Sequence, residues 1–330
     1  MKFGLFGGAR EHEGVEDGYR VAYNSYIEAV IEAEALGYYS NFLVEHHFSG
    51  LGQVSASLNL LTYIAAKTST IRLGPAVVVI PWHNPMLIAE QAATLDLLSG
   101  GRLDFGVGKG YRYNEFQGFC IPIEESGERF EEAMEVIRKA WTTEGRFSHH
   151  GKRWHFDDVV CEPATAQQPH PPFWMAAGRA ESLQYAAREG YNLFLDQFQT
   201  FDVIFERLRI YKQAMAAAGR EYDPLGVAVA RGLLIANTDA EREALIAKRM
   251  KMLDVMNAFG RSPKGDQKSS MVSDDDLYKA TVEGTLIGTP DEIIERLQSM
   301  QAEGVEYVLL AVAAPEALRT FAKEIMPAFA

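Results

Sequence analysis

The sequence predicts an α/β fold, a TIM (β/α)8 barrel with insertions, and three observations favour it. Short apolar runs that end in glycine or proline alternate with stretches of helical apolar spacing. This alternation is typical of a parallel sheet whose strands are joined by helices. Eight strand–helix pairs can be counted along the 330 residues, which is the number that a TIM barrel needs. An open, doubly wound sheet is the alternative, but it accounts less well for so regular a count.

The expected strands and helices follow one another in a regular order. The strands are expected at 2–6, 40–47, 71–80, 102–110, 172–177, 192–198, 226–237 and 306–312. The helices are expected at 22–37, 55–69, 84–101, 126–143, 181–190, 200–219, 239–253, 289–304 and 315–329. Most of the strands are rich in β-branched or aromatic residues, whereas the helices repeat apolar residues every three or four positions.

Several of these helices carry start and stop signals. Ser55 is the expected N-cap of the second helix, because its hydroxyl can accept a hydrogen bond from a first-turn amide. Asn84 is expected to cap the third helix, with Pro85 at its first position and Gly100 as its terminator. Thr289 is the expected cap of a late helix whose first turn is acidic.

The chain is expected to form a single barrel domain over residues 1–330, with two interruptions. Residues 145–172 contain several prolines, glycines and histidines and are interpreted as an excursion from the barrel. Residues 260–284 are polar and loosely patterned, which predicts a mobile loop over the active site. A plainly solvated, disordered loop is the alternative for this second segment.

Composition and charge exclude several classes of function. Hydrophobic residues make up 47% of the chain and charged residues 23%, which is ordinary for a globular protein. The formal net charge of −13 makes nucleic acid and anionic membranes poor partners. The two cysteines have no paired spacing, the N-terminus lacks a signal-peptide pattern, and no apolar run is long enough to span a membrane. We therefore expect a cytoplasmic protein.

The second expected strand ends in an unusual polar group, Glu45-His46-His47. In a barrel this end of a strand lies at the mouth, where active sites form. Adjacent strand residues point to opposite faces, so the two imidazoles cannot easily share an ion, and no metal is expected. A catalytic or cofactor-contacting role for one histidine is favoured, because imidazole titrates near neutral pH. The alternative is that both are strand-end residues satisfied by loops.

Two further strand ends carry weaker signals for a flat or anionic ligand. After the fourth strand, glycines around Gly108-Lys109 let a ligand approach the backbone, although on this segment alone a plain tight turn after the strand is favoured. After the fifth strand, Gly178, Arg179 and Ser182 stand at the start of a helix. Free amide groups, a guanidinium and a hydroxyl there can bind an anion. A capped helix with an exposed arginine is the alternative.

Taken together, these pieces resemble the bacterial luciferase-like flavin-dependent monooxygenase family over essentially the whole chain. The resemblance is carried by EHHF at 45–48, the block 74–119, HPPFWMAAGRAESLQYAAREG at 170–190 and LIGTPDEIIERL at 286–297. The block 74–119 is the most specific, because its motifs Asn84-Pro85, Ala89-Glu90-Gln91, Leu95-Asp96 and Ser99-Gly100-Gly101-Arg102 stand in the family's order and spacing.

The resemblance implies a barrel that binds reduced FMN as a co-substrate. Reduced FMN would react with O2 to form a C4a-hydroperoxide, which then oxygenates a small-molecule organic substrate. A separate NAD(P)H-dependent flavin reductase is implied as the source of reduced FMN, and a homodimer is expected. The substrate cannot be read from the sequence, because its contacts are scattered over eight loops.

The resemblance also assigns candidate site residues by position. His46 matches the family's active-site histidine, and we expect it to move or hold a proton, or to donate a hydrogen bond, beside the flavin. Ala76 and Val77 match a position where the family has a non-proline cis peptide beneath the isoalloxazine ring. Gly108 and Lys109 match positions beside the flavin after the fourth strand. Glu45 and His47 are expected to support the loop that carries His46.

The phosphate-binding turn of the family matches Gly178, Arg179 and Ser182. The chain departs from luciferases here, because Gly178-Arg179 replaces a Glu-Ser pair, and this change should favour a dianion. It departs again at Gly108, which replaces a reactive cysteine, so no thiol chemistry is expected. Two alternatives stay open: an F420-dependent or other flavin oxidoreductase on the same barrel, and a non-catalytic flavin-binding protein.

Overall fold

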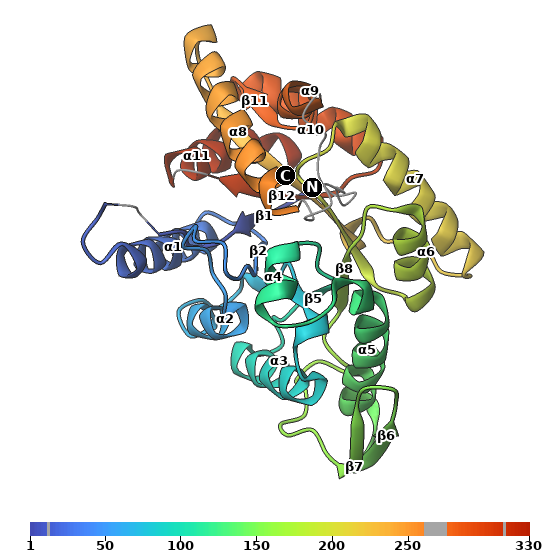
Figure 1. Cartoon of the computed structure of the whole chain (residues 1–330). Coiled ribbons are helices and arrows are strands. Elements are labelled where there is room, and N and C mark those ends of the chain that lie inside the picture. The colour runs from blue at the N-terminus through green and yellow to red at the C-terminus, as the bar shows by residue number, and fades with distance from the viewer. Residues whose placement is uncertain (12–13, 261–275, 313–314) are drawn as a thin grey trace. The chain divides into compact units, whose positions relative to one another are not determined.

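The structure is a computed structural model that describes residues 1–11, 14–260, 276–312 and 315–330 (Figure 1). In these ranges the main sheet contains the strands β1 (Lys2–Gly7), β2 (Ser40–Leu43), β3 (Arg72–Pro75), β4 (Val78–Val79), β5 (Phe105–Gly108), β8 (Phe173–Ala176), β9 (Asn192–Leu195), β10 (Val227–Ile235), β11 (Leu286–Gly288) and β12 (Tyr307–Val312). The helices are α1 (Gly18–Ala35), α2 (Ser57–Ala65), α3 (Pro85–Ser99), α4 (Tyr113–Gly118), α5 (Ser126–Thr142), α6 (Ala180–Glu189), α7 (Phe201–Ala217), α8 (Asp239–Gly260), α9 (Leu277–Glu283), α10 (Pro290–Ala302) and α11 (Pro315–Thr320).

The strand order confirms the predicted fold class. The order is β3-β2-β1-β12-β10-β9-β8-β5-β4, and β11 pairs with β10. Strand β10 runs parallel to β9, β11 and β12, and β1 runs parallel to β12. The first and last strands of this path, β3 and β4, are consecutive pieces of one expected strand that is interrupted at Ala76-Val77. A mostly parallel sheet whose path returns to its start is the nearly closed sheet of a TIM barrel.

The residues group into two compact units. The C-terminal unit comprises Met1–Gly7, Glu32–Phe42 and Met175–Ala330, and the N-terminal unit comprises Gly8–Ile31 and Leu43–Trp174. One boundary follows the end of β1, and the other three fall inside α1, β2 and β8, so each of these three elements contributes residues to both units. Each unit is described below by itself, and the expectation of a single domain over residues 1–330 stays a prediction.

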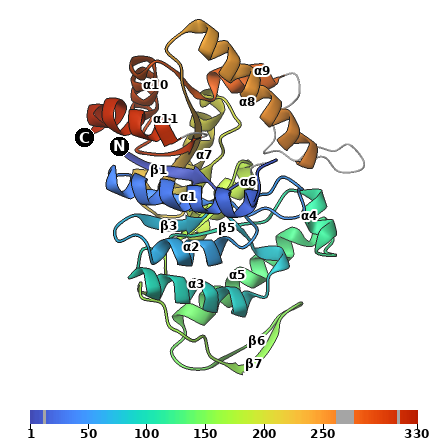
Figure 2. The same ribbon diagram turned by 90° about the vertical axis from the view of Figure 1, so that its left-hand side faces the viewer.

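In the N-terminal unit, helices α2 and α3 lie side by side (Figure 2). The predicted cap of α3 is confirmed, since the Asn84 side chain accepts hydrogen bonds from the amides of Met86 and Leu87. The predicted cap of α2 is wrong: the N-cap is Ala56, without a side-chain hydrogen bond. The serine at the start of this helix, Ser57, instead donates its hydroxyl hydrogen to Glu45. A contact with a distant buried carboxylate therefore replaces the local cap.

The expected excursion at 145–172 contains an antiparallel hairpin, β6 (Phe147–His150) and β7 (His155–Val159). Residues at its turn form ion pairs with α5 and with Glu125, the residue directly before this helix. Lys152 Nζ lies 2.6 Å from the Glu128 carboxylate, and Arg153 Nη1 lies 3.0 Å from that of Glu125. The hairpin is visible beside α5 in Figure 2.

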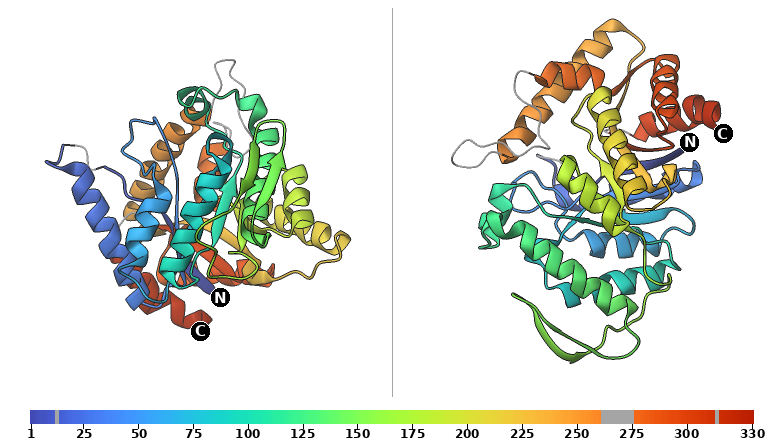
Figure 3. Two further views of the ribbon diagram at one scale, coloured as in Figure 1. Left: turned by 90° about the horizontal axis from the view of Figure 1, so that it is seen from below. Right: turned by 90° about the vertical axis from the view of Figure 1, so that its right-hand side faces the viewer.

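In the C-terminal unit, β10 is the strand with the most sheet partners, and α6 and α7 lie side by side (Figure 3). Thr289 forms the predicted cap of α10 as a full capping box with Glu292. The two chain ends meet here, because the Met1 ammonium donates to the carbonyl oxygen of Phe329 at 3.2 Å (Figure 1).

Most of the predicted mobile loop at 260–284 lies outside the described residues. Its described end contains helix α9, which the sequence pattern did not predict. Among the residues that the structure describes, no helix is long and apolar enough to cross a membrane.

Candidate active site

The polar group Glu45-His46-His47 follows β2 in the N-terminal unit, as part of a loop. The strand was expected to run to His47 but ends at Leu43. The amide of His46 donates to the carbonyl oxygen of Val54 at 2.9 Å. This hydrogen bond holds the start of the loop against a residue eight positions further along the chain. The three side chains therefore lie just beyond the carboxyl end of a buried strand, where barrel enzymes place catalytic groups.

His46 is hydrogen-bonded to a buried carboxylate, Glu115. Its Nδ1 lies 3.0 Å from Glu115 Oε1, and the same oxygen accepts the backbone amide of His47 at 2.9 Å. A carboxylate can only accept, so Nδ1 carries the hydrogen and Nε2 of the neutral ring keeps its lone pair. The His46 side chain keeps 16% of its surface exposed, whereas that of Glu115 keeps 2%. The ring is thus oriented by a partner that solvent barely reaches.

Burial favours the neutral form of His46. It lowers the pKa of His46 below its ordinary value of 6.5, and Arg112 lowers it further, while Glu115 and Glu45 oppose both. Arg112, which is 1% exposed, lies 3.8 Å from Glu115 Oε1 and donates to Gln53 Oε1 at 3.2 Å. At neutral pH the imidazole is therefore a proton acceptor at Nε2.

Glu45 does not contact His46 but organises a second network. Its carboxylate accepts the Ser57 hydroxyl at 3.0 Å and lies 3.2 Å from His83 Nε2 and 3.4 Å from His47 Nε2. Burial alone would raise the pKa of Glu45, but the hydrogen bonds from His47 and His83 outweigh it and hold the pKa at about 2. The amide of Val79 in β4 also donates to this carboxylate, at 3.4 Å. Glu45 therefore ties the histidine loop to the strand that follows Ala76-Val77.

The peptide bond between Ala76 and Val77 is cis, as the resemblance implied. The Ala76 amide donates to the carbonyl oxygen of Leu43 at 2.7 Å, so this peptide is attached to the end of β2. Gly108 lies against the Val77 side chain, since a Cβ at Gly108 would stand 2.4 Å from Val77 Cγ2. The structure thus brings together His46, Ala76-Val77 and Gly108 through β2, β4 and β5.

Lys109 belongs to the same strand end, but its ammonium is directed to helix α5. Its Nζ lies 3.1 Å from Glu131 Oε1 and 5.3 Å from the centre of the Phe130 ring. The side chain of Lys109 is thus directed to α5, and its backbone, next to Gly108, is the part that can contact a cofactor.

Aromatic rings cover the loop that carries the histidines. Trp82 stacks on Phe119 with ring centres 5.0 Å apart, and it meets His47 and Phe116 edge-on at 5.7 Å and 5.2 Å. The indole N–H of Trp82 is buried and has no hydrogen-bond partner among the described residues. An apolar wall with one unused donor is what a largely apolar ligand needs at its polar edge.

Reasoning from the sequence did not find Glu115. The residue lies in the YNEF stretch at 113–116, inside the block that carries the family resemblance, but no strand end pointed to it. It is 69 residues from His46, and helix α4, which was not predicted, brings it there. The sequence signal that could have identified Glu115 is a carboxylate on a short polar segment directly after the fourth strand.

The predicted phosphate turn lies in the C-terminal unit. Arg179 is exposed and is the N-cap of α6, without a side-chain cap hydrogen bond, so the amides of the first turn are not capped by a side chain. Ser182 is half-buried in that turn. Gly178 lies against Arg207, whose Cζ would stand 3.1 Å from a Cβ at this position. The turn therefore combines first-turn amides that the N-cap side chain does not cap, a hydroxyl and nearby guanidinium groups.

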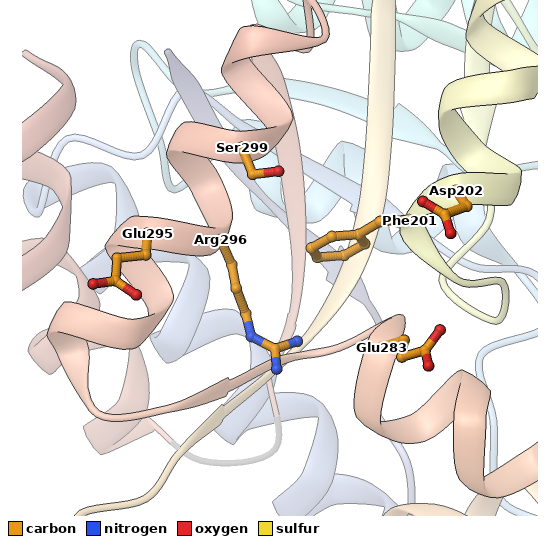
Figure 4. Close-up of a pocket in the computed structure, with 6 residues that line it drawn as sticks. All are labelled: Phe201, Asp202, Glu283, Glu295, Arg296 and Ser299. Atoms are coloured by element: carbon orange, nitrogen blue, oxygen red, sulfur yellow. The ribbon is translucent and has the colours of Figure 1, made fainter.

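A pocket of about 440 Å³ in the C-terminal unit contains none of the predicted catalytic or cofactor-binding residues, although Glu283 belongs to the predicted loop 260–284. Its walls are formed by Phe201, Asp202, Glu283, Glu295, Arg296 and Ser299 (Figure 4). The phenyl ring of Phe201 lies among Ser299, Arg296 and Asp202 in this view. Three carboxylates against one guanidinium make a poor environment for an anionic cofactor.

A barrel sheet with a buried carboxylate–histidine pair at a strand end defines a TIM-barrel enzyme. The chain belongs to the luciferase-like monooxygenase family, whose profile matches residues 1–307. Named relatives in this family are flavin-dependent monooxygenases, so the chain is an oxidoreductase that uses O2.

Two relatives illustrate this. The chain is 29% identical over 290 residues to an FMNH2-dependent dimethylsulfone monooxygenase of Pseudomonas putida, which covers 82% of this chain and 77% of the relative. It is 25% identical over 350 residues to the oxygenase component of a flavin-dependent trigonelline monooxygenase of Acinetobacter baylyi, covering 100% and 96%.

Solved structures share the fold over the full length. The monooxygenase RslO1 from Streptomyces bottropensis superimposes with a TM-score of 0.83 at 25% identity, covering 100% of both chains. An F420-dependent secondary alcohol dehydrogenase superimposes with a TM-score of 0.78 at 16% identity, covering 100% of this chain and 99% of the other. At 16% identity the likeness shows the fold alone.

Proposed function

We propose that the protein is the oxygenase component of a two-component system, which uses reduced FMN and O2 to oxygenate a small organic molecule. The observation that carries the proposal is the His46–Glu115 hydrogen bond, which leaves His46 Nε2 as a proton acceptor in a half-buried position. Relatives that use FMNH2, and one that is named as an oxygenase component, support the choice of cofactor and system.

The residues present fit FMN. For the ring system, the backbone at Ala76-Val77 and Gly108 offers a surface without long side chains, and the Trp82 indole offers an unused donor. For the phosphate, the first turn of α6 offers amides that no side chain caps, together with Arg179 and Ser182. The two sets lie in different units, and each is assigned by its own chemistry.

Reduced FMN, when bound, supplies the electrons that activate O2. The role of His46 is to take up a proton at Nε2 during turnover and to return it, because a neutral imidazole with a fixed Nδ1–H is suited to both. Glu115 orients the ring and stabilises its charged form when the proton arrives. Trp82, Phe116 and Phe119 exclude water from the loop, which such chemistry requires.

The partners follow from this assignment. An NAD(P)H-dependent flavin reductase supplies reduced FMN, and the chain acts as a homodimer in the cytoplasm.

Equilibrium titration with FMN, reduced FMN, riboflavin and F420 tests the cofactor. We expect reduced FMN to bind most tightly, and tight binding of F420 with no binding of FMN would overturn the assignment.

A second experiment tests the role of His46. With reduced FMN, O2 and a panel of organic substrates, His46→Ala should lower product formation by about 10²-fold, as for a lost general acid–base, and leave the Kd of FMN unchanged. His150→Ala, on the exposed hairpin, is the matched control. Equal product from His46→Ala and wild type would exclude the proton-transfer role.

A further inference from the structure

Three buried arginines gather where β9 ends beside the middle of β10, in the C-terminal unit. Arg231 in β10 is 0% exposed, and Arg207 in α7 and Arg249 in α8 are each 7% exposed. Buried arginines are rare in proteins unless each has a paired acid. This cluster, Arg207–Arg231–Arg249, is called the arginine cluster below.

The cluster lies at the carboxyl end of a parallel strand. Val229 of β10 is in register with Leu195, the last residue of β9, so Arg231 is level with the loop that follows β9. Arg231 Nη1 donates to the carbonyl oxygen of Asp196 in this loop at 2.9 Å. Arg249 Nη2 donates to the side-chain oxygen of the next residue, Gln197, at 3.0 Å. Loops at this edge of a parallel sheet are where ligands bind.

Several donors of the cluster are unused. Arg231 Nε and Nη2 and Arg249 Nε are buried, and the described residues offer them no hydrogen-bond partner. One side of the Arg231 guanidinium is covered by the Phe201 ring, whose centre is 5.1 Å from Cζ. A buried charged donor without an acceptor costs more than an exposed one, so an arrangement with three of them points to an absent acceptor.

The charge balance of the cluster is positive. Among the residues that the structure describes, the cluster has one direct carboxylate, that of Asp196, which lies 2.5 Å from Arg207 Nη1. The charges that act on Arg231 among the described residues come from Asp196, Arg249 and Arg207. Burial lowers the pKa of Arg231 to about 9 and that of Arg249 to about 10, so both remain charged at neutral pH. Three guanidinium groups and one carboxylate leave two positive charges to neutralise, in a chain of net charge −13.

We propose that the arginine cluster binds an oxyanion, with Arg231 and Arg249 as its donors. The identity of the oxyanion rests on the proposed function, because the anion is assigned to a ligand of that reaction. Two sources have the required chemistry: a carboxylate or sulfonate group of the organic substrate, and the phosphate of the flavin. Guanidinium groups bind such planar or tetrahedral oxyanions through paired N–H donors, and Arg207 is held in place by Asp196.

The first experiment measures anion binding without flavin. The purified full chain is titrated with benzoate, methanesulfonate and inorganic phosphate, and with benzamide as the uncharged counterpart of benzoate, by calorimetry and by thermal unfolding. We expect saturable binding of at least one anion, a raised Tm, and no effect of benzamide. In Arg231→Met, binding of that anion should weaken about tenfold to a hundredfold, the scale of lost charge-assisted hydrogen bonds.

The matched control is Arg220→Met, which removes an exposed arginine from the same unit and should leave binding unchanged. Arg231→Met removes a buried charge whose Nε and Nη2 have no partner among the described residues, so the Tm without anion should stay the same or rise. A structural role for Arg231 predicts the reverse, a lower Tm and no anion effect. Arg249→Met gives a second reading if Arg231→Met fails to fold.

A second arm distinguishes the two sources. The Kd values of FMN and riboflavin are compared in wild type and Arg231→Met. A selective loss of FMN binding assigns the site to the flavin phosphate. An unchanged FMN-to-riboflavin ratio, with weakened binding of benzoate or methanesulfonate, assigns it to an anionic substrate. Anion binding that is absent from wild type, or equal in wild type and Arg231→Met, would overturn the proposal. The first experiment contains no flavin, so its measured anion binding does not depend on FMN. Failure of FMN to bind would therefore refute the proposed cofactor without affecting the test of the arginine cluster.

Discussion

Glu115 Oε1 lies 3.0 Å from His46 Nδ1, and this contact joins residues 69 positions apart in the chain. It fixes which nitrogen of the imidazole carries the hydrogen and which is free to take a proton. The carboxylate is positioned by α4, the helix that directly follows the loop after β5.

Glu115 is predicted to act as a positioning residue. Glu115→Gln removes the charge that raises the pKa of His46, so the acidic limb of the pH profile of kcat should move to lower pH. Glu115→Ala also loses the acceptor and should lower kcat by about tenfold or more. Glu124→Gln, which changes an exposed carboxylate nearby, is the control. Identical pH profiles for Glu115→Gln and wild type would contradict this role.

Glu45 is predicted to make stability depend on pH. The folded-state pKa of Glu45 is about 2, below the ordinary value of 4.5, so its contribution is complete above about pH 4.5 and is lost as the pH falls toward 2. Glu45→Gln should lower the free energy of unfolding near pH 7 by on the order of 2–3 kcal/mol. The difference from wild type should shrink as the pH falls from 5 to 3 in urea unfolding experiments. A difference that is constant over this range would argue against the low pKa.

Gly108 is predicted to tolerate no side chain while Val77 is present. A Cβ at Gly108 would stand 2.4 Å from Val77 Cγ2, so Gly108→Ala should destabilise the protein by about 1–3 kcal/mol. Val77→Ala should recover part of this loss, and a double-mutant cycle measures the coupling. Gly127→Ala is the matched control, because a Cβ there meets no atom within 4 Å. Additive effects of the two substitutions would show that no clash exists.

Arg179 is predicted to select FMN over riboflavin. It stands at the start of α6, where an arginine side chain and first-turn amides can share a phosphate. Arg179→Ala should weaken FMN binding about tenfold and leave riboflavin binding unchanged, as measured by flavin fluorescence. Arg188→Ala, an exposed position at the other end of the same helix, should change neither Kd. Equal weakening of FMN and riboflavin would place the phosphate elsewhere.

Local signals in the sequence predicted the barrel well. The eight expected strands are all present, and Asn84 and Thr289 cap their helices because cap chemistry depends on neighbouring residues alone. The misses have tertiary causes. Ser57 contributes its hydroxyl to Glu45, and strand three divides at Ala76-Val77 into β3 and β4. Strand β11 has three residues, too few to show a periodic pattern.

The candidate site was predicted only in part, because local signals are visible in the sequence and tertiary contacts are not. His46 could be found because a polar group at a strand end is visible in the sequence. The partner of His46 could not be found, because pairing with Glu115 requires that α4, 69 residues further along the chain, be brought to the loop after β2. The arginine cluster was missed likewise: Arg231 interrupts an apolar strand, and its neighbours Arg207 and Arg249 come from two separate helices.

The contact between Met1 and Phe329 has a practical consequence for engineering. Since the ends of the chain meet, a short peptide linker can join them, and new ends can be opened elsewhere. The new ends should avoid the turn between β6 and β7, because Lys152 there is ion-paired with Glu128 and the amides of Arg153 and Trp154 donate to Glu132. In such a circularly permuted protein the strands would follow one another in a different order along the chain, while their order in the sheet would stay the same.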